Sequence, residues 1–473
     1  MRGPDHPMGV RRGRGRFLAV AIAALFIGSA LGVATAAVPG GQSWAKLYDG
    51  PANDADWAYS TAASPDGSKV FVTGQSLGTT SDFDYATMAY DAVSGARLWT
   101  KRYNGGGNGG DGGLAVGLSP DGSRVFVTGW STAATFQTEY VTIAYDASDG
   151  TRLWRARYHG GGSNLAYALV VSPDGRSVYV SGGTYSSTSG SDFGTVAYDS
   201  ATGARLWTRR YNGPANGDDS VYFSGLGVSP DGSTLVVTGY SAGATSDLDY
   251  ATIGYDAVTG KRLWAKRYNG RADGADTPSG LSVSGDSSAV FVTGSSTTAS
   301  NTSDYATVAY DLSTGDRLWV RRFDGPASSF DFGLGVGTSP DGSRVFVTGG
   351  SAGPTDYDYA TLAYDASTGA EIWMKRYNGP TDLEDRAVAV GVSPDGMAVY
   401  VTGSSYASTK QFATLAYEAS TGARLWVKRY DAPSGSDDTP WDLAVAPDGS
   451  GVFVTGYTEG PTPGDFATVA YAP

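Results

Sequence analysis

The sequence contains no cysteine and only two histidines among 473 residues. The lack of cysteine excludes a disulfide framework, a lipid-anchored cysteine and any thiolate nucleophile or metal ligand. His159 is the only histidine beyond residues 1–36, so that part of the chain cannot form a metal centre from several imidazoles. A Ser-His-acid triad there would depend on this one residue.

Positive charge is also scarce, because 34 lysines and arginines stand against 47 aspartates and glutamates, for a formal net charge of −13. A protein of this sign repels the phosphate backbone of nucleic acids. We therefore expect no nucleic-acid partner.

Long apolar runs are absent except near the N-terminus, from Phe17 to Ala34. Four arginines at positions 11–16 precede this run, and the small residues Ala34-Thr35-Ala36 end it. This order is typical of a secretory signal peptide. We predict a signal peptide over 1–36, a secreted or cell-envelope-associated protein, and no membrane contact after cleavage. A single membrane anchor is the alternative, because the run approaches the length of a membrane span.

What the chain does have is a repeat. Eight of its 11 tryptophans recur at intervals of 53 to 57 residues, namely Trp44, Trp99, Trp154, Trp207, Trp264, Trp319, Trp373 and Trp426. A fixed repeat of this length indicates a solenoid or a propeller. The copies run from Gln42 to the last residue without a linker, so we predict one domain over 37–473.

Each repeat is predicted to form four short strands. In the second copy the predicted strands are 113–118, 124–129, 140–146 and 152–158. The first pair is joined by the tight turn Ser119-Pro120-Asp121-Gly122, and the second pair by a similar turn at 147–150. Four antiparallel strands joined by hairpins form one blade of a β-propeller.

The first and last repeats are each incomplete, and each contains the strands that the other lacks. The region opens with a lone fourth strand at 43–48 and closes with a third strand at 466–471. Pairing the two would complete an eighth blade and leave no free edge. We predict an all-β, eight-bladed propeller of four-stranded antiparallel blades, closed by the N-terminal fourth strand against the three C-terminal strands. A linear β-solenoid is the alternative.

Two motifs resemble known propellers. The segment Ala363–Trp373 resembles the tryptophan-docking motif of the eight-bladed quinoprotein dehydrogenases, and the segment Ser339–Gly349 resembles surface-layer-type repeats. The whole unit is similar to secreted bacterial β-propeller-repeat proteins. The resemblance implies that the tryptophans join neighbouring blades. The quinoprotein site also uses an adjacent cysteine pair, which this chain lacks, so we do not expect pyrroloquinoline quinone as a cofactor.

Propeller topology places the uniform turns on one face and the loops of variable length on the other, which is acidic. A first acidic row recurs eight residues before the Ser-Pro-Asp-Gly position: Asp56, Asp111, Asn164, Asp276, Asp331, Asp385 and Asp438, with the fourth copy out of register and Asp219 nearby. We predict its aspartates Asp56, Asp111, Asp276, Asp331, Asp385 and Asp438 as metal ligands, with calcium as the cofactor. The alternative is a repeated side-chain cap on a strand.

A second acidic row precedes the aromatic residue of each third strand: Asp84, Glu139, Asp192, Asp249, Asp304, Asp358, Gln411 and Asp465. Basic residues instead gather on the fourth strands. We expect them to discourage edge pairing between molecules and to favour a monomer.

Trp57 and Trp441 are single aromatics in the variable loops, beside the first acidic row. Ring closure would make their blades adjacent, so we predict them as ligand-face aromatics, with loop packing as the alternative. The sequence favours a binding or scaffold module for a cation, a glycan or a basic protein surface. The alternative function is a quinoprotein-like oxidoreductase or a calcium-dependent hydrolase with a site in the central channel. No catalytic residue is assigned.

Overall fold

The computed structural model describes residues 38–473 except 134–136, 434 and 460–463, and residues 38–473 form one compact unit. The predicted signal peptide, 1–36, lies outside the described residues. No helix in the described part of the chain is long and apolar enough to cross a membrane.

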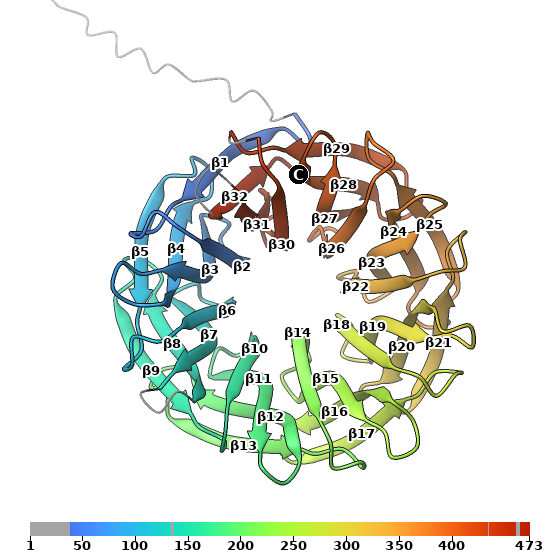
Figure 1. Cartoon of the computed structure of the whole chain (residues 1–473), viewed down its shortest axis with the longest axis horizontal. Coiled ribbons are helices and arrows are strands. Elements are labelled where there is room, and N and C mark those ends of the chain that lie inside the picture. Colours follow the sequence, from blue (N-terminus) through green and yellow to red (C-terminus); the bar gives the residue numbers. More distant parts are fainter. Residues whose placement is uncertain (1–37, 134–136, 434, 460–463) are drawn as a thin grey trace, which may run out of the picture. The chain divides into compact units, whose positions relative to one another are not determined.

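The unit consists of eight four-stranded antiparallel sheets arranged as a ring (Figure 1). Blade 1 contains β2 (Asp56–Ala63), β3 (Lys69–Leu77), β4 (Phe83–Asp91) and β5 (Arg97–Tyr103). Blade 2 contains β6 (Asp111–Leu118), β7 (Arg124–Thr132), β8 (Thr138–Asp146) and β9 (Arg152–Tyr158). Blade 3 contains β10 (Asn164–Val171), β11 (Ser177–Ser186), β12 (Gly190–Asp199) and β13 (Arg205–Tyr211). Blade 4 contains β14 (Asp219–Val228), β15 (Thr234–Ala242), β16 (Leu248–Asp256) and β17 (Arg262–Tyr268).

The second half of the ring repeats this order. Blade 5 contains β18 (Asp276–Val283), β19 (Ala289–Thr297), β20 (Ser303–Asp311) and β21 (Arg317–Phe323). Blade 6 contains β22 (Asp331–Thr338), β23 (Arg344–Ala352), β24 (Tyr357–Asp365) and β25 (Glu371–Tyr377). Blade 7 contains β26 (Asp385–Val392), β27 (Ala398–Tyr406), β28 (Lys410–Glu418) and β29 (Arg424–Tyr430). Blade 8 contains β30 (Asp438–Val445), β31 (Val452–Thr458), β32 (Asp465–Tyr471) and β1 (Gln42–Tyr48).

Both ends of the chain build blade 8. Strand β1 pairs antiparallel with β32, with Trp44 opposite Ala470 and Leu47 opposite Ala467. In Figure 1 the blue β1 lies beside the red β32, and the first strand of every blade lies nearest the centre of the ring. The predicted eight-bladed propeller and its closure are confirmed.

The repeated tryptophans join successive blades. Trp99 of blade 1, for example, donates its indole N–H to the carbonyl of Ala147 in blade 2 at 3.3 Å. Its ring lies against Gly150, whose φ of +71° and close approach exclude a side chain at this turn. This contact confirms the structural role that the docking motif implies.

The hydrophobic core lies between blades rather than in one centre. The cluster between blades 1 and 2 combines Phe71 and Trp99 with Val125, Val127 and Ile143, all nearly or fully buried. Each such side chain contributes about 1.5–3 kcal/mol when it leaves water. Because every junction repeats this arrangement, the ring holds the innermost strands in fixed positions.

The strands extend further than predicted in two places. Strand β6 begins at Asp111 and β7 continues to Thr132, so the first acidic row opens the innermost strands. The fourth copy also departs from prediction, because Asp219 opens β14 and accepts the N–H of Gly213, six residues earlier. The extra residues of this copy lie further along, where the register shifts between Val221 and Leu226.

Candidate binding site in the central channel

A one-residue β-bulge in seven of the eight innermost strands builds the wall of the channel. The register between the first and second strands shifts between Ala58 and Ser60 in blade 1, and between Pro440 and Asp442 in blade 8. The extra residue has no partner on the second strand, and a bulge of this kind re-aims its side chain. In seven blades this residue lines one cavity: Tyr59, Leu114, Tyr167, Ser279, Leu334, Val388 and Trp441.

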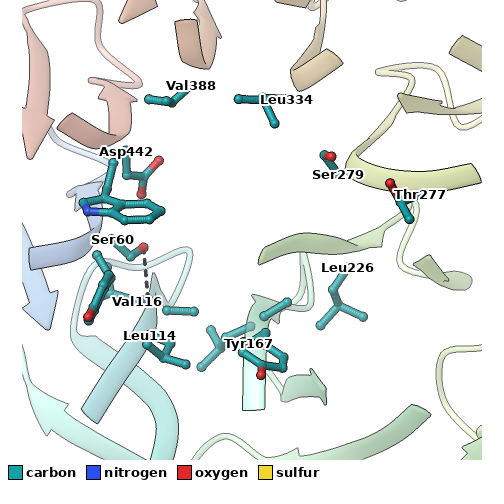
Figure 2. Close-up of a pocket in the computed structure, with 15 residues that line it drawn as sticks. Ser60, Leu114, Val116, Tyr167, Leu226, Thr277, Ser279, Leu334, Val388 and Asp442 are labelled. Carbon is teal, nitrogen blue, oxygen red and sulfur yellow. Dashed lines mark hydrogen bonds between the residues drawn. The ribbon is translucent and has the colours of Figure 1, made fainter. Parts of the chain in front are cut away.

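The cavity has a volume of about 510 Å³. Figure 2 shows Leu114, Tyr167 and Leu226 on one side of it and Leu334 and Val388 on the other. The backbone N–H of Val116 donates to Ser60 at 3.4 Å and links the first two blades there. The fifteen lining residues include no lysine, arginine or histidine.

Asp442 is the only carboxylate in this lining. Its Oδ2 accepts the N–H of Thr61 in blade 1 at 2.9 Å, and its Oδ1 accepts the N–H of Leu443 at 2.8 Å. These two amides fix the orientation of the carboxylate. Burial, the largest cause, raises the pKa of Asp442 above its ordinary value.

Two aromatic rings flank the same part of the wall. Trp441 is 41% exposed, and its ring meets that of Tyr59 edge to face, with centroids 5.8 Å apart. Burial raises the pKa of Tyr59 to about 12, so its hydroxyl stays neutral near pH 7. The cavity therefore combines aromatic surface, aliphatic surface and one oriented carboxylate.

The predicted metal ligands of the first acidic row lie at the starts of six different innermost strands, and they do not gather in one site. All six are buried. Each accepts a backbone N–H from the residue six positions earlier, as Asp276 does from Gly270. This geometry matches the strand cap that the sequence left as the alternative. Calcium binding at this row stays a prediction.

Burial also changes the pKa values of these carboxylates. It raises the pKa of Asp56, Asp111 and Asp438 from 3.8 to about 6, against the opposing effect of their hydrogen bonds. Two of the six predicted ligands belong to clusters of three carboxylates. In the described part of the chain, Asp56 clusters with Asp49 and Asp465, and Asp331 with Asp304 and Asp324.

The second acidic row forms ion pairs with the fourth strands. In blade 4, Arg267 Nη2 lies 2.6 Å from Asp249 Oδ2 and donates to the carbonyl of Ser241 at 2.8 Å. Equivalent pairs occur in blades 1, 2, 3, 5 and 6. One arginine in each of these six fourth strands thus has an inward structural role that edge protection did not predict.

The two predicted ligand-face tryptophans have different environments. Trp57 lies in β2 rather than in a loop as predicted, and its ring stacks on Phe83 of β4 at 5.1 Å and lies 6.2 Å from Tyr457 of β31. Trp441 instead lines the cavity. Sequence reasoning missed Tyr59, Tyr167 and Asp442 as wall residues.

Comparison with known proteins identifies the family. A family model described as outer membrane protein assembly factor BamB matches residues 33–219, 139–325 and 306–454. The chain belongs to this family. The overlapping matches reflect the internal repeat of this BamB-family propeller. No curated protein shows significant sequence similarity to it.

Solved structures share the fold at low identity. BamB from Moraxella catarrhalis is 14% identical with a TM-score of 0.51, over 92% of this chain and 100% of its own. Sqt1 from Chaetomium thermophilum, bound to the N-terminus of the ribosomal protein L10, is 12% identical with a TM-score of 0.59, over 90% and 98%. The quinohemoprotein alcohol dehydrogenase from Comamonas testosteroni is 14% identical with a TM-score of 0.55, over 91% and 76%.

The channel of this BamB-family propeller does not fit pyrroloquinoline quinone. That cofactor carries three carboxylates, which require cationic or strongly donating partners. The cavity lining offers no basic side chain and adds a carboxylate of its own, Asp442. No reaction step through this cofactor follows from the structure.

Proposed function

We propose that this BamB-family propeller is a secreted binding module that captures a basic segment of a partner protein. A lysine or arginine side chain of that segment enters the central channel. The observation that supports this proposal is the lining of the cavity. Asp442 is its one carboxylate, Trp441 and Tyr59 lie in the same wall, and no basic residue balances the charge.

The chemistry of the wall suits an ammonium or guanidinium group. Burial favours the neutral form of Asp442, but a cation bound beside it favours the ionised form. The ionised carboxylate then supplies a charge-assisted hydrogen bond, worth about 1.5–3 kcal/mol. An aromatic face such as that of Trp441 adds about 0.5–2 kcal/mol of cation–π attraction. The aliphatic lining, including Leu334 and Val388, accommodates the methylene groups of a long basic side chain.

The charge of the molecule supports the same partner. A net charge of −13 attracts a basic polypeptide and accelerates its encounter with the acidic loop face. This attraction weakens as salt screens it. Sqt1, which shares the fold, is bound to the N-terminus of another protein, so a ring of this type can hold a polypeptide end.

Calorimetric titration tests the proposal. We expect a lysine-rich peptide to bind, a glutamate-rich peptide of equal length not to bind, and affinity for the basic peptide to fall as salt increases. Equal affinity for basic and acidic peptides would contradict the proposal. Dye reduction by the protein in the presence of pyrroloquinoline quinone and an alcohol would favour the oxidoreductase alternative instead.

Secretion rests on the predicted signal peptide and is tested separately. We expect protein recovered outside the producing cells to begin after Ala36. Retention in the cytoplasm with residues 1–36 intact would contradict this part of the proposal.

A further inference from the structure

Six asparagines of the chain stand directly before a glycine, and they form two sets. The first set belongs to the repeated Tyr-Asn-Gly segment after a fourth strand: Asn104, Asn212, Asn269 and Asn378. The second set stands four residues further along two of these loops: Asn108 and Asn216. In such a pair the backbone nitrogen of the glycine can attack the side-chain carbonyl carbon of the asparagine, because glycine has no Cβ to obstruct the approach.

In the first set a carboxylate of the first acidic row accepts the N–H of the glycine. Gly105 donates to Asp111 Oδ2 at 2.5 Å. The other three glycines donate at the same distance: Gly213 to Asp219, Gly270 to Asp276 and Gly379 to Asp385. Burial raises the pKa of Asp111 to about 6, so this carboxylate is ionised at pH 8. Attack requires the glycine nitrogen to lose its proton, and the resulting negative charge would lie beside the carboxylate. These four asparagines are therefore protected.

The second set lacks this protection. The N–H groups of Gly109 and Gly217 form no hydrogen bond within the described residues. Asn108 and Asn216 are both exposed to solvent. Their glycine nitrogens can therefore lose a proton without placing a charge against a bound carboxylate.

The side-chain amides of Asn108 and Asn216 also differ from each other. In both, Oδ1 accepts an N–H from the asparagine four residues earlier: Asn108 from Asn104 at 3.0 Å, and Asn216 from Asn212 at 2.6 Å. A donor here stabilises the negative charge that develops on Oδ1 when the carbonyl carbon is attacked. The Nδ2 of Asn216 additionally donates to the carbonyl of Thr188 at 2.8 Å, which retains the leaving nitrogen. In the part of the chain that the structure describes, Asn108 Nδ2 has no such partner.

We propose that Asn108 is a site of spontaneous deamidation in the folded protein, and that the first acidic row protects the Asn-Gly bonds of the repeat. The nitrogen of Gly109 loses its proton and bonds to Cγ of Asn108, and the Cγ–Nδ2 bond breaks with release of ammonia. Water then opens the cyclic succinimide and leaves aspartate or isoaspartate. Each event consumes one water and adds one negative charge to the acidic loop face. This site is independent of the channel and of the proposed function.

Peptide mass spectrometry of the folded protein, sampled during incubation at pH 8, tests the assignment. Deamidation changes the mass because a hydroxyl group replaces an amino group. Trypsin releases residues 103–124 as one peptide that contains both Asn104 and Asn108, so fragment ions compare the two in the same molecule. We expect Asn108 to react roughly 10-fold faster than Asn104 or more, the factor given by one hydrogen bond to a charged group. Asn216 should react at an intermediate rate.

Variants of Asp111 test the protection directly. Asp111→Ala frees the N–H of Gly105, so deamidation of Asn104 should accelerate toward the rate of Asn108. Asp111→Asn is the matched variant, because an asparagine can replace this acceptor, as Asn164 does for Gly160 at 3.2 Å in blade 3. It should leave Asn104 slower than in Asp111→Ala. Thermal unfolding of both variants shows whether each retains the fold.

The control for the sequence itself is a synthetic peptide of residues 103–124. It is unfolded, so neither glycine is held by a carboxylate, and Asn104 and Asn108 should react at similar rates. The comparison between this peptide and the folded wild type needs no variant. Equal rates at the two asparagines in the folded protein would overturn the proposal. Faster reaction at Asn104 would overturn it too, because the carboxylate would then act as a base rather than as protection.

Discussion

The indole N–H of Trp44 donates to the carbonyl oxygen of Ala92 at 2.8 Å and so joins the N-terminal strand of blade 8 to blade 1. The Trp44 ring also lies 5.9 Å from Tyr90 in blade 1 and 6.0 Å from Phe453 in blade 8. One residue near the start of the chain therefore contacts both blades of the closing junction.

Replacing Trp44 with alanine will open this junction. The change removes a side chain that is 6% exposed and leaves the Ala92 carbonyl without its donor. We expect a loss of about 3–5 kcal/mol in the free energy of unfolding. Amide exchange of β1 and β32 should accelerate. Trp207→Ala, which removes the same contact from blades 3 and 4, should cost a similar amount and leave exchange in β1 slow. Unchanged exchange in β1 of Trp44→Ala would count against closure by this residue.

Gly95 should tolerate no side chain. Its φ is +67°, and a Cβ there would lie 2.6 Å from Cδ2 of Trp44. Gly95→Ala combines backbone strain with displacement of the indole, so we expect a loss of about 2 kcal/mol or more. Gly106→Ala is the control, because a Cβ there meets no atom within 4 Å. Similar midpoints of thermal unfolding for the two variants would contradict this reasoning.

Neighbouring basic residues of β17 should differ in their effect on stability. Arg267 and its partner Asp249 are 23% and 6% exposed, whereas Lys266 and Asp316 are 35% and 75% exposed. Removing one partner of an enclosed pair leaves an uncompensated charge, whereas an exposed pair contributes about 0–1 kcal/mol. Arg267→Gln should therefore lower Tm clearly and Lys266→Gln hardly at all. The reverse order in a denaturation series would show that these ion pairs do not stabilise the blades.

Asp438 should make stability depend on pH. Burial raises its pKa from 3.8 to about 6 in the folded protein. The folded state therefore holds the proton more tightly than the unfolded chain. The contribution of this protonation to the free energy of unfolding is fully present below about pH 4 and is lost as pH rises through about 6. Asn164 occupies the equivalent position in blade 3 and accepts the hydroxyl hydrogen of Thr184 at 2.5 Å, so asparagine fits this site.

Asp438→Asn is therefore expected to be more stable than the wild type at pH 7, with a gain of up to ~3 kcal/mol. The difference should shrink as pH falls toward 4, because the wild-type carboxyl is then protonated too. Thermal unfolding of both proteins across this range provides the measurement. A difference that stays constant with pH would refute the assigned titration.

The fold could be predicted because its determinants repeat. The spacing of tryptophans such as Trp44 and Trp99, and the matching phases of 43–48 and 466–471, require only the sequence. Packing between blades then fixes each strand, since every junction uses the same contacts.

The cavity wall could not be predicted in the same way. Whether Tyr59 or Tyr167 faces the channel depends on a one-residue bulge, which shifts the alternation of side chains and leaves no sequence motif. One signal was present, however. The residue after the bulge is small in blades such as 1 and 2, where it is Ser60 and Ala115, but it is Asp442 in blade 8. Blade 4 also departs, with Leu226 after a longer irregularity, but Asp442 is the one acidic residue at this position in the described strands.

The pairing of the second acidic row also required the structure. The sequence shows an acid such as Asp249 and an arginine such as Arg267 at fixed positions, but only the strand register brings them together. From the sequence alone, these arginines were expected to prevent edge pairing between molecules, and no acidic partner was assigned to them.

The most direct test of the binding account compares two aspartate variants in calorimetric titrations with one lysine-rich peptide. Asp442→Asn keeps the shape of the channel but removes its charge, so we expect an affinity loss of roughly 10-fold or more. Asp247→Asn removes an exposed charge outside the cavity lining and should change affinity less than about twofold. Equal affinities for the wild type and Asp442→Asn would contradict binding of a basic side chain in the channel.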